Sequence, residues 1–102
     1  MDILETLKGL TDATGVSGLE RNAAEIALSG LKKYAPDAHI DHSGNVVGVI
    51  RCGIPGAKTL MLDAHIDQIG FIVTCINSDG SLKIGSCGGP DMKIMLAQSV
   101  TV

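Results

Sequence analysis

Aromatic residues are scarce in this sequence of 102 residues, where they account for 2% and comprise Tyr34, Phe71 and no tryptophan. Modules that bind nucleic acids commonly stack bases on aromatic side chains, so this composition argues against them. The net charge of −3 at neutral pH also argues against a basic surface for phosphate groups. We therefore expect no nucleic-acid partner.

Cysteine pairs and long apolar runs are missing as well. Cys52, Cys75 and Cys87 form an odd set without paired spacing, which predicts neither a disulfide framework nor a Cys-x-x-Cys zinc site. Such usage fits a reducing compartment. No apolar run approaches the length of a membrane span, and the first residues lack the pattern of a signal peptide. The expectation is a soluble, cytoplasmic protein without a membrane partner.

What the sequence does contain is a helical pattern in its first third. Apolar residues recur at helical spacing after Asp2, which can cap a helix: Ile3, Leu4, Leu7 and Leu10. A second apolar stripe of period near 3.6 runs from Leu19 to Tyr34 and predicts another helix, which Pro36 ends. Ser17-x-x-Glu20 predicts a capping box at the start of this second helix.

The pattern changes after Pro36 to short extended segments separated by turn residues. Strands are predicted over five ranges: 38–41, 46–50, 59–62, 69–76 and 81–84. The last two form a hairpin across residues 77–80. Residues 59–62 are continuously apolar, which predicts a strand buried on both faces within a sheet flanked by helices. The fold class is therefore predicted to be α/β.

The end of the sequence resembles the interior of a strand. Val100, Thr101 and Val102 are apolar or β-branched, whereas natural termini are usually polar. Two helices and about five short strands are also too few to close a sheet buried on both faces. The expectation from this pattern is a piece of a longer chain.

The sharpest chemical feature is a His-x-Asp that follows an apolar strand. His65 and Asp67 lie two residues apart, so in a strand they would face the same side. Ligands commonly bind at such strand ends in sheets flanked by helices. A neutral imidazole suits zinc or cobalt, and a neighbouring carboxylate can orient it. The alternative is a structural histidine that is merely hydrogen-bonded to a carboxylate.

Other candidate groups are weaker. Asp63 can face the same way as His65, although a plain strand-face carboxylate is the simpler interpretation. The turn residues His39, Asp41 and His42 can bind a metal adventitiously, but such a cluster is typical of turn chemistry. Serines and cysteines without a recognisable base or activating partner are Ser17, Ser43, Cys52, Cys75 and Cys87. A catalytic metal site needs about three protein ligands and a general base, so His65 and Asp67 do not complete one.

Several motifs together resemble one family. The stretch Leu60-Met61-Leu62-Asp63-Ala64-His65-Ile66-Asp67-Gln68-Ile69-Gly70-Phe71 is similar to the first metal motif of the cytoplasmic metallo-aminopeptidases, which include glutamyl aminopeptidase and the tetrahedral aminopeptidases. Three further stretches resemble the same family in the same order: Gly15-Val16-Ser17-Gly18-Leu19-Glu20, Asp41-His42-Ser43-Gly44-Asn45 and Gly88-Gly89-Pro90-Asp91. Gln68 stands where many relatives have glutamate.

This resemblance implies an architecture and a site. Residues 1–69 would be the first part of a phosphorylase/peptidase-like α/β catalytic domain, and residues 70–102 would begin an inserted β-domain, both incomplete. The family binds two divalent metal ions, zinc or cobalt, and removes N-terminal residues from peptides. Its inserted domain forms dimers that can build a dodecamer. By motif match, His65 corresponds to the first metal ligand and Asp67 to the supporting catalytic aspartate.

The resulting expectation is a metallo-aminopeptidase whose remaining ligands and general base lie beyond position 102. The 102-residue chain alone is then expected to be inactive and to bind the metals incompletely. One alternative is a non-catalytic remnant or assembly module whose exposed last strand pairs with another chain. Another is a related two-metal carboxypeptidase or deacylase, which the Gly44-Asn45 turn and the Gly-Gly-Pro-Asp stretch make less favoured.

Overall fold

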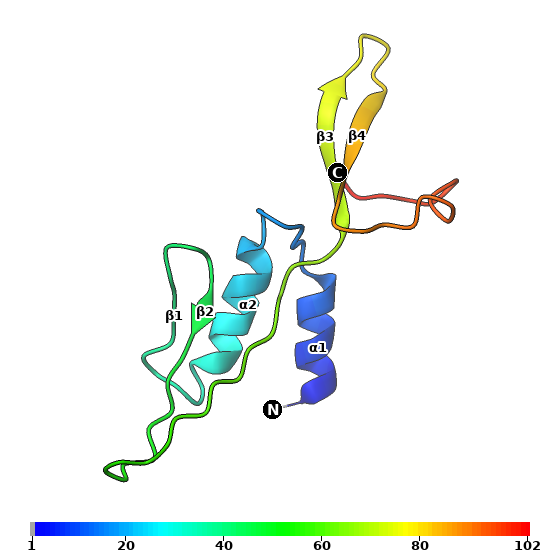
Figure 1. Cartoon of the computed structure of the whole chain (residues 1–102). Helices are drawn as coiled ribbons and strands as arrows, with labels where there is room; N and C mark the ends of the chain where they lie inside the picture. The colour runs from blue at the N-terminus through cyan, green and yellow to red at the C-terminus, as the bar shows by residue number, and fades with distance from the viewer. Residues whose placement is uncertain (1) are drawn as a thin grey trace.

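Two helices and two small antiparallel sheets make up the computed structural model, which describes residues 2–102 (Figure 1). The elements in chain order are α1 Ile3–Asp12, α2 Arg21–Leu31, β1 His39–Ile40, β2 Val46–Val47, β3 Gly70–Ile76 and β4 Leu82–Cys87. β1 pairs with β2, and β3 pairs with β4. The chain is therefore a small α/β structure, as the sequence predicts. No helix within residues 2–102 is long and apolar enough to cross a membrane.

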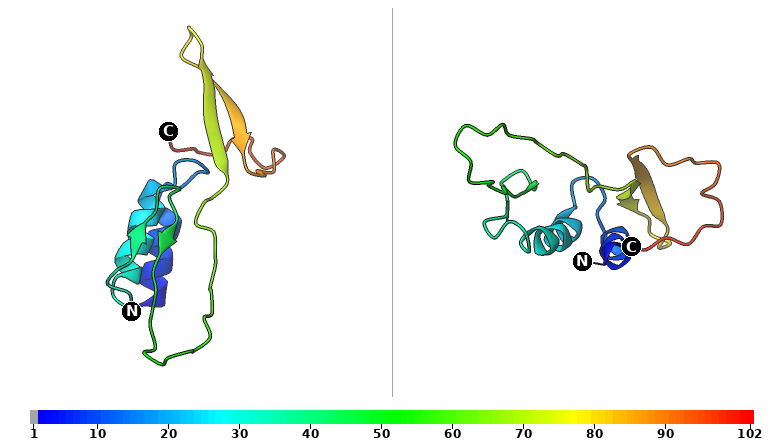
Figure 2. Two further views of the ribbon diagram at one scale, coloured as in Figure 1. Left: turned by 60° about the vertical axis from the view of Figure 1, so that its left-hand side comes forward. Right: turned by 90° about the horizontal axis from the view of Figure 1, so that it is seen from below.

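Both predicted helices form, and they lie side by side in the two views (Figures 1 and 2). Asp2 caps α1, because its Oδ1 accepts a hydrogen bond from the backbone N–H of Leu4 at 2.9 Å. α2 is shorter than the apolar stripe, since Leu19 and Tyr34 at the ends of the stripe lie outside it and are exposed. The buried apolar residues of the described chain are four alanines: Ala23, Ala24, Ala35 and Ala38.

The capping box predicted from Ser17 and Glu20 is wrong. α2 begins at Arg21, with Glu20 itself at the N-cap position and without a side-chain cap. The Glu20 carboxylate accepts a hydrogen bond from the backbone N–H of Gly18, and the Ser17 hydroxyl donates to Asp67. The Ser17 hydroxyl therefore bonds to a carboxylate 50 residues away, and not to the backbone N–H of Glu20 as a capping box requires.

The predicted hairpin is confirmed as β3 and β4. The turn closes through the backbone N–H of Gly80, which donates to the carbonyl of Asn77 at 3.0 Å. β4 continues to Cys87, three residues beyond the predicted limit of 84. The register shifts between Val73 and Cys75, which marks a bulge in β3. In both figures the hairpin projects away from the two helices.

Three predicted extended segments differ from the structure. β2 ends at Val47, so residues 48–50 are not part of a strand. Residues 59–62 and 100–102 belong to no strand, and Leu60, Met61 and Leu62 are 81%, 81% and 88% exposed. The prediction of a doubly buried strand at 59–62 is therefore wrong for this chain. A strand forms only with a ladder partner, and no segment of residues 2–102 pairs with this one.

The overall shape is elongated. The radius of gyration is 18.1 Å, and the chain extends 64 × 29 × 21 Å. A folded domain of this length has a radius of gyration of about 13 Å. The solvent-accessible surface is 8664 Å², against about 5,400 Å² for a globular protein of this mass. Many apolar side chains that a globular domain would bury are consequently exposed to solvent.

Candidate functional site

The connection between α1 and α2 lies against the segment that precedes β3. The backbone N–H of Gln68 donates to the carbonyl of Gly15 at 2.8 Å, and Val16 pairs with Gln68 in a parallel bridge. The Gln68 side-chain amide also donates, through Nε2, to the carbonyl of Ala13 at 3.0 Å. These three interactions bring residues 13–17 next to the His-x-Asp although more than 45 positions separate them.

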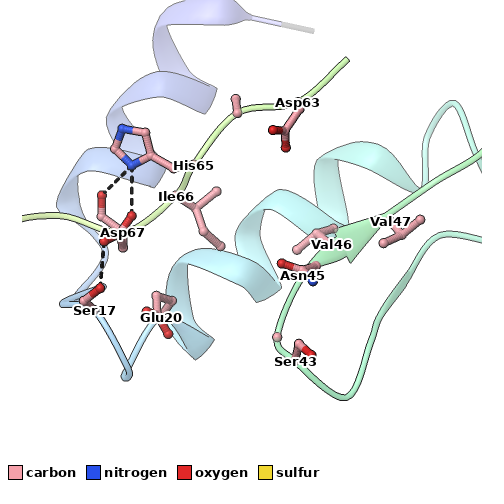
Figure 3. Close-up of a pocket in the computed structure, with 12 residues that line it drawn as sticks. Ser17, Glu20, Ser43, Asn45, Val46, Val47, Asp63, His65, Ile66 and Asp67 are labelled. Atoms are coloured by element: carbon pink, nitrogen blue, oxygen red, sulfur yellow. Dashed lines mark hydrogen bonds and ion pairs between the residues drawn. The ribbon is translucent and has the colours of Figure 1, made fainter. Parts of the chain in front are cut away.

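This contact places His65, Asp67 and Ser17 in one hydrogen-bonded chain (Figure 3). The Nδ1 of His65 lies 2.9 Å from Oδ1 of Asp67 and 3.1 Å from the Asp67 backbone carbonyl. Both neighbours are acceptors, so Nδ1 carries the proton and donates. The Ser17 hydroxyl donates to Oδ2 of Asp67 at 2.8 Å. The second ring nitrogen, Nε2, points away from the carboxylate in Figure 3 and keeps its lone pair.

The electrostatics of the site favour an ionised carboxylate. The hydrogen bond from Ser17, followed by that from His65, lowers the pKa of Asp67 below its ordinary value. The Asp67 side chain is 39% exposed, and the His65 side chain is 85% exposed. An ionised Asp67 and an accessible His65 are therefore the state of the pair at neutral pH. The ring is not buried among aliphatic side chains.

These residues line a pocket of about 580 Å³. Its wall also includes Glu20 from the start of α2, Ser43 and Asn45 from the β1–β2 turn, and Asp63. Figure 3 shows Asp63 apart from the pair formed by His65 and Asp67. With three carboxylates and one histidine, the lining attracts cations.

The donor set fits part of a metal site. An imidazole that donates from Nδ1 to a carboxylate and keeps Nε2 available is the common arrangement of a metal-ligating histidine with its orienting partner. Across residues 2–102, however, no three side chains among His, Cys, Asp and Glu are grouped closely enough to hold an ion. Within residues 2–102, the donor set therefore consists of one oriented imidazole with a free Nε2 lone pair, fewer than the three protein ligands that a catalytic metal site needs.

Two of the turn residues that are weaker candidates, Asp41 and His39, have hydrogen-bond partners within their own turn region. Oδ1 of Asp41 accepts from the backbone N–H groups of Ser43 and Asn45, each at 2.9 Å, and Oδ2 accepts from Nδ2 of Asn45 at 3.0 Å. These bonds lower the pKa of Asp41, with the Asn45 side-chain amide as the largest cause. Nδ1 of His39 lies 3.2 Å from the carbonyl of Asp37. Asp41 therefore acts as a turn residue.

Sequence reasoning missed the contribution of Ser17 and Gln68. The sequence pattern predicts a local cap for Ser17 and indicates no partner for the neutral amide of Gln68. The amide is a donor that a glutamate at this position would lack, and it reaches the Ala13 carbonyl. No periodic pattern connects positions 50 or more apart, so only the shared occurrence of these motifs in a family could have signalled the contact.

Comparison with known proteins agrees with the resemblance. Residues 44–102 match the model of the family described as M42 glutamyl aminopeptidase. Over 100 residues, which cover 98% of this chain, the sequence is 34% identical to an Escherichia coli (strain K12) protein named "Putative aminopeptidase SgcX". The aligned part spans 27% of that relative's length. The family match includes His65, Asp67 and the whole β3–β4 hairpin. From the motifs and the family match together, we conclude that this chain belongs to the M42 glutamyl aminopeptidase family.

Proposed function

We propose that this chain carries part of the catalytic site of a metal-dependent aminopeptidase. His65 would ligate one of two divalent ions, zinc or cobalt, through Nε2, and Asp67 would be the supporting aspartate. The observation that carries this proposal is the 2.9 Å contact between Nδ1 of His65 and Oδ1 of Asp67, which leaves Nε2 accessible. The family match supplies the reaction class: removal of N-terminal residues from peptide substrates.

The residues of this chain would prepare the site rather than complete it. When bound, the metal ions would polarise the scissile carbonyl and lower the pKa of a water molecule. Asp67 fixes the ring orientation and the tautomer of His65, so that the Nε2 lone pair stays available to a metal ion. Glu20 and Asp63 add negative charge to the lining and would favour cation entry.

The proposal extends to the domain organisation. Residues 1–69 would belong to the catalytic domain, and residues 70–102 would begin an inserted β-domain that forms dimers and larger homo-oligomers in the cytoplasm. The supporting observation is the separate projection of the β3–β4 hairpin from the helices (Figure 1). Both strands of this hairpin have exposed apolar side chains, with exposed fractions of 56% for Ile72, 71% for Ile76 and 48% for Ile84.

The 102-residue chain by itself is proposed to have no appreciable peptidase activity. It supplies one oriented histidine ligand and spans 27% of the length of the E. coli relative. Its apolar segment at residues 60–62 is largely exposed, as expected for a surface that other parts of a catalytic domain would cover.

The test is a titration of the chain with Co²⁺ or Zn²⁺, read by histidine NMR signals, together with an assay on an aminoacyl chromogenic substrate. Weak binding at His65 is expected, with loss in His65→Ala and retention in the matched variant His39→Ala. No turnover is expected. Binding that His65→Ala leaves unchanged would contradict the ligand assignment, and metal-dependent turnover like that of an intact aminopeptidase would contradict the proposed inactivity.

A second candidate is a non-catalytic assembly module, which the exposed apolar faces of the hairpin favour. Native mass spectrometry of the chain separates the two. A stable oligomer that binds no metal at His65 would support the assembly module. A related carboxypeptidase or deacylase activity has less support, because the family match is to aminopeptidases.

A further inference from the structure

We propose that Ser17 is a positioning residue that acts through Asp67 on His65. This inference rests on the proposed function only for its effect on metal binding, since the hydrogen bonds themselves exist in the metal-free chain. The geometry that carries it consists of two hydrogen bonds, one to each oxygen of the Asp67 carboxylate. Ser17 donates to Oδ2 at 2.8 Å, and His65 donates to Oδ1 at 2.9 Å.

Hydrogen bonds to both oxygens restrict the rotation of the Asp67 carboxylate. The terminal torsion of an aspartate is broad, so a carboxylate bonded at one oxygen can rotate about its last bond. A second donor on the other oxygen fixes the carboxylate plane and therefore the direction from which Oδ1 meets the ring. Because Asp67 is partly exposed, water competes for both oxygens, and the contribution of Ser17 is expected to be modest.

Ser17 can orient Asp67 because its own backbone is held in place. The preceding residue, Val16, is bridged to Gln68, and the Val16 carbonyl accepts from the backbone N–H of Leu19 at 2.8 Å. On the other side, the thiol of Cys87 at the end of β4 donates to the Ser17 carbonyl at 3.7 Å. The hydroxyl thus comes from a loop anchored to the segment just after Asp67 and to the hairpin.

The hydroxyl also has no role in the helix cap that the sequence predicted. Glu20 holds the N-cap position of α2, and its carboxylate accepts from the N–H of Gly18. The Ser17 side chain is consequently free of the capping role and points to Asp67 (Figure 3). Its consequence for His65 is a stronger preference for the tautomer with the proton on Nδ1 and the lone pair on Nε2.

The first measurement is the tautomer of His65 in the metal-free chain, read from imidazole ¹⁵N shifts at about pH 8.5, where an ordinary histidine is neutral. The wild type is expected to hold mainly the Nδ1–H form. Ser17→Ala should shift the population towards Nε2–H, and Ser17→Thr, which keeps the hydroxyl, should restore it. Ser78→Ala, in the exposed turn of the hairpin, is the matched control and should have no effect.

The second measurement is Co²⁺ affinity at His65. Loss of an outer partner that contacts the ligand directly lowers metal affinity about 10- to 100-fold. Ser17 acts one bond further away, so Ser17→Ala should lower the affinity about 3- to 10-fold. Far-ultraviolet circular dichroism and the Gln68 amide signal should match the wild type, which shows that the fold is kept.

The outcomes separate the two proposals. A tautomer shift in Ser17→Ala with restoration by Ser17→Thr supports the positioning role, whether or not the wild type binds metal at His65. Absence of metal binding at His65 in the wild type would overturn the proposed function alone. An unchanged tautomer and unchanged Co²⁺ affinity in Ser17→Ala would overturn the positioning role. A shift that Ser17→Thr does not restore, or that accompanies loss of helical signal, would also overturn it, because the hydroxyl would not be the cause.

Discussion

Val16 and Gly70 lie so close together that a methyl group on Gly70 would stand 2.6 Å from Cγ2 of Val16. This contact lies at the start of β3, two residues after the bridge that links Val16 to Gln68. A side chain at position 70 would therefore push the α1–α2 connection away from the His-x-Asp segment.

Gly70→Ala is expected to destabilise this contact by about 1–3 kcal/mol, the usual cost of overpacking. The readout is hydrogen exchange at the Gln68 amide, which is bonded to Gly15 and should exchange faster. Val16→Ala combined with Gly70→Ala should recover most of the loss, because the two Val16 methyl groups that the new side chain would meet are then absent. Gly89→Ala is the control, since its added Cβ meets nothing within 4 Å. Equal exchange in Gly70→Ala and Gly89→Ala would contradict the prediction.

Gln68→Glu tests the side-chain bond to Ala13. The substitution removes the amide donor and places a carboxylate oxygen against a carbonyl oxygen, so the bond is lost. We expect a cost of about 1 kcal/mol, which corresponds to roughly fivefold faster exchange of the Gln68 amide. Gln98→Glu makes the same change at an exposed position far along the chain. If the backbone amide of residue 68 exchanges at the wild-type rate in both variants, the Gln68 side chain makes no net contribution to the contact.

Asp2→Ala tests the cap of α1. Oδ1 of Asp2 accepts from the backbone N–H of Leu4, and its loss should cost about 1 kcal/mol of helix stability. The measurement is the ¹³Cα secondary shift of residues 3–5, which should fall towards random-coil values. Asp2→Asn keeps an acceptor oxygen and should retain most of the helical shift. A helical shift in Asp2→Ala equal to that of the wild type would show that the cap contributes nothing.

The pH dependence of the β1–β2 turn follows from Asp41. Hydrogen bonds to its carboxylate, above all from the Asn45 side chain, lower its pKa in the folded chain. A group with a depressed folded pKa contributes stability above its unfolded pKa of about 3.9, and this stability is lost as the pH falls through the folded value. The turn should therefore stay intact at pH 5 and open only in more acidic solution.

NMR of the Asn45 amide and the Asp41 carboxyl carbon between pH 6 and pH 2 provides the check. The wild-type midpoint should lie below the ordinary aspartate value. Asn45→Ala removes the principal donor, so the midpoint should rise towards the ordinary value. A wild-type midpoint at or above the ordinary value, or one that Asn45→Ala leaves unchanged, would contradict the assignment.

Local patterns predicted the elements that local interactions stabilise. α1 begins where Asp2 caps it, and the β3–β4 hairpin turns where Gly80 permits the left-handed conformation, with φ of 85°. The β1–β2 turn likewise depends on Asp41 and residues within four positions of it. The strand predicted at residues 59–62 does not form, because its stability would require a partner strand that residues 2–102 do not provide.

Sequence patterns are enough to predict both helices, the hairpin and the pairing of His65 with Asp67 two residues later. The hydrogen bond from Ser17 to Asp67 and the pairing of Gln68 with residues 13–16 become visible only in the folded chain. The physical reason is the range of the interactions. A cap or turn satisfies hydrogen bonds within a few residues, whereas the partners of Asp67 and Gln68 meet only after the chain has folded back across about 50 positions.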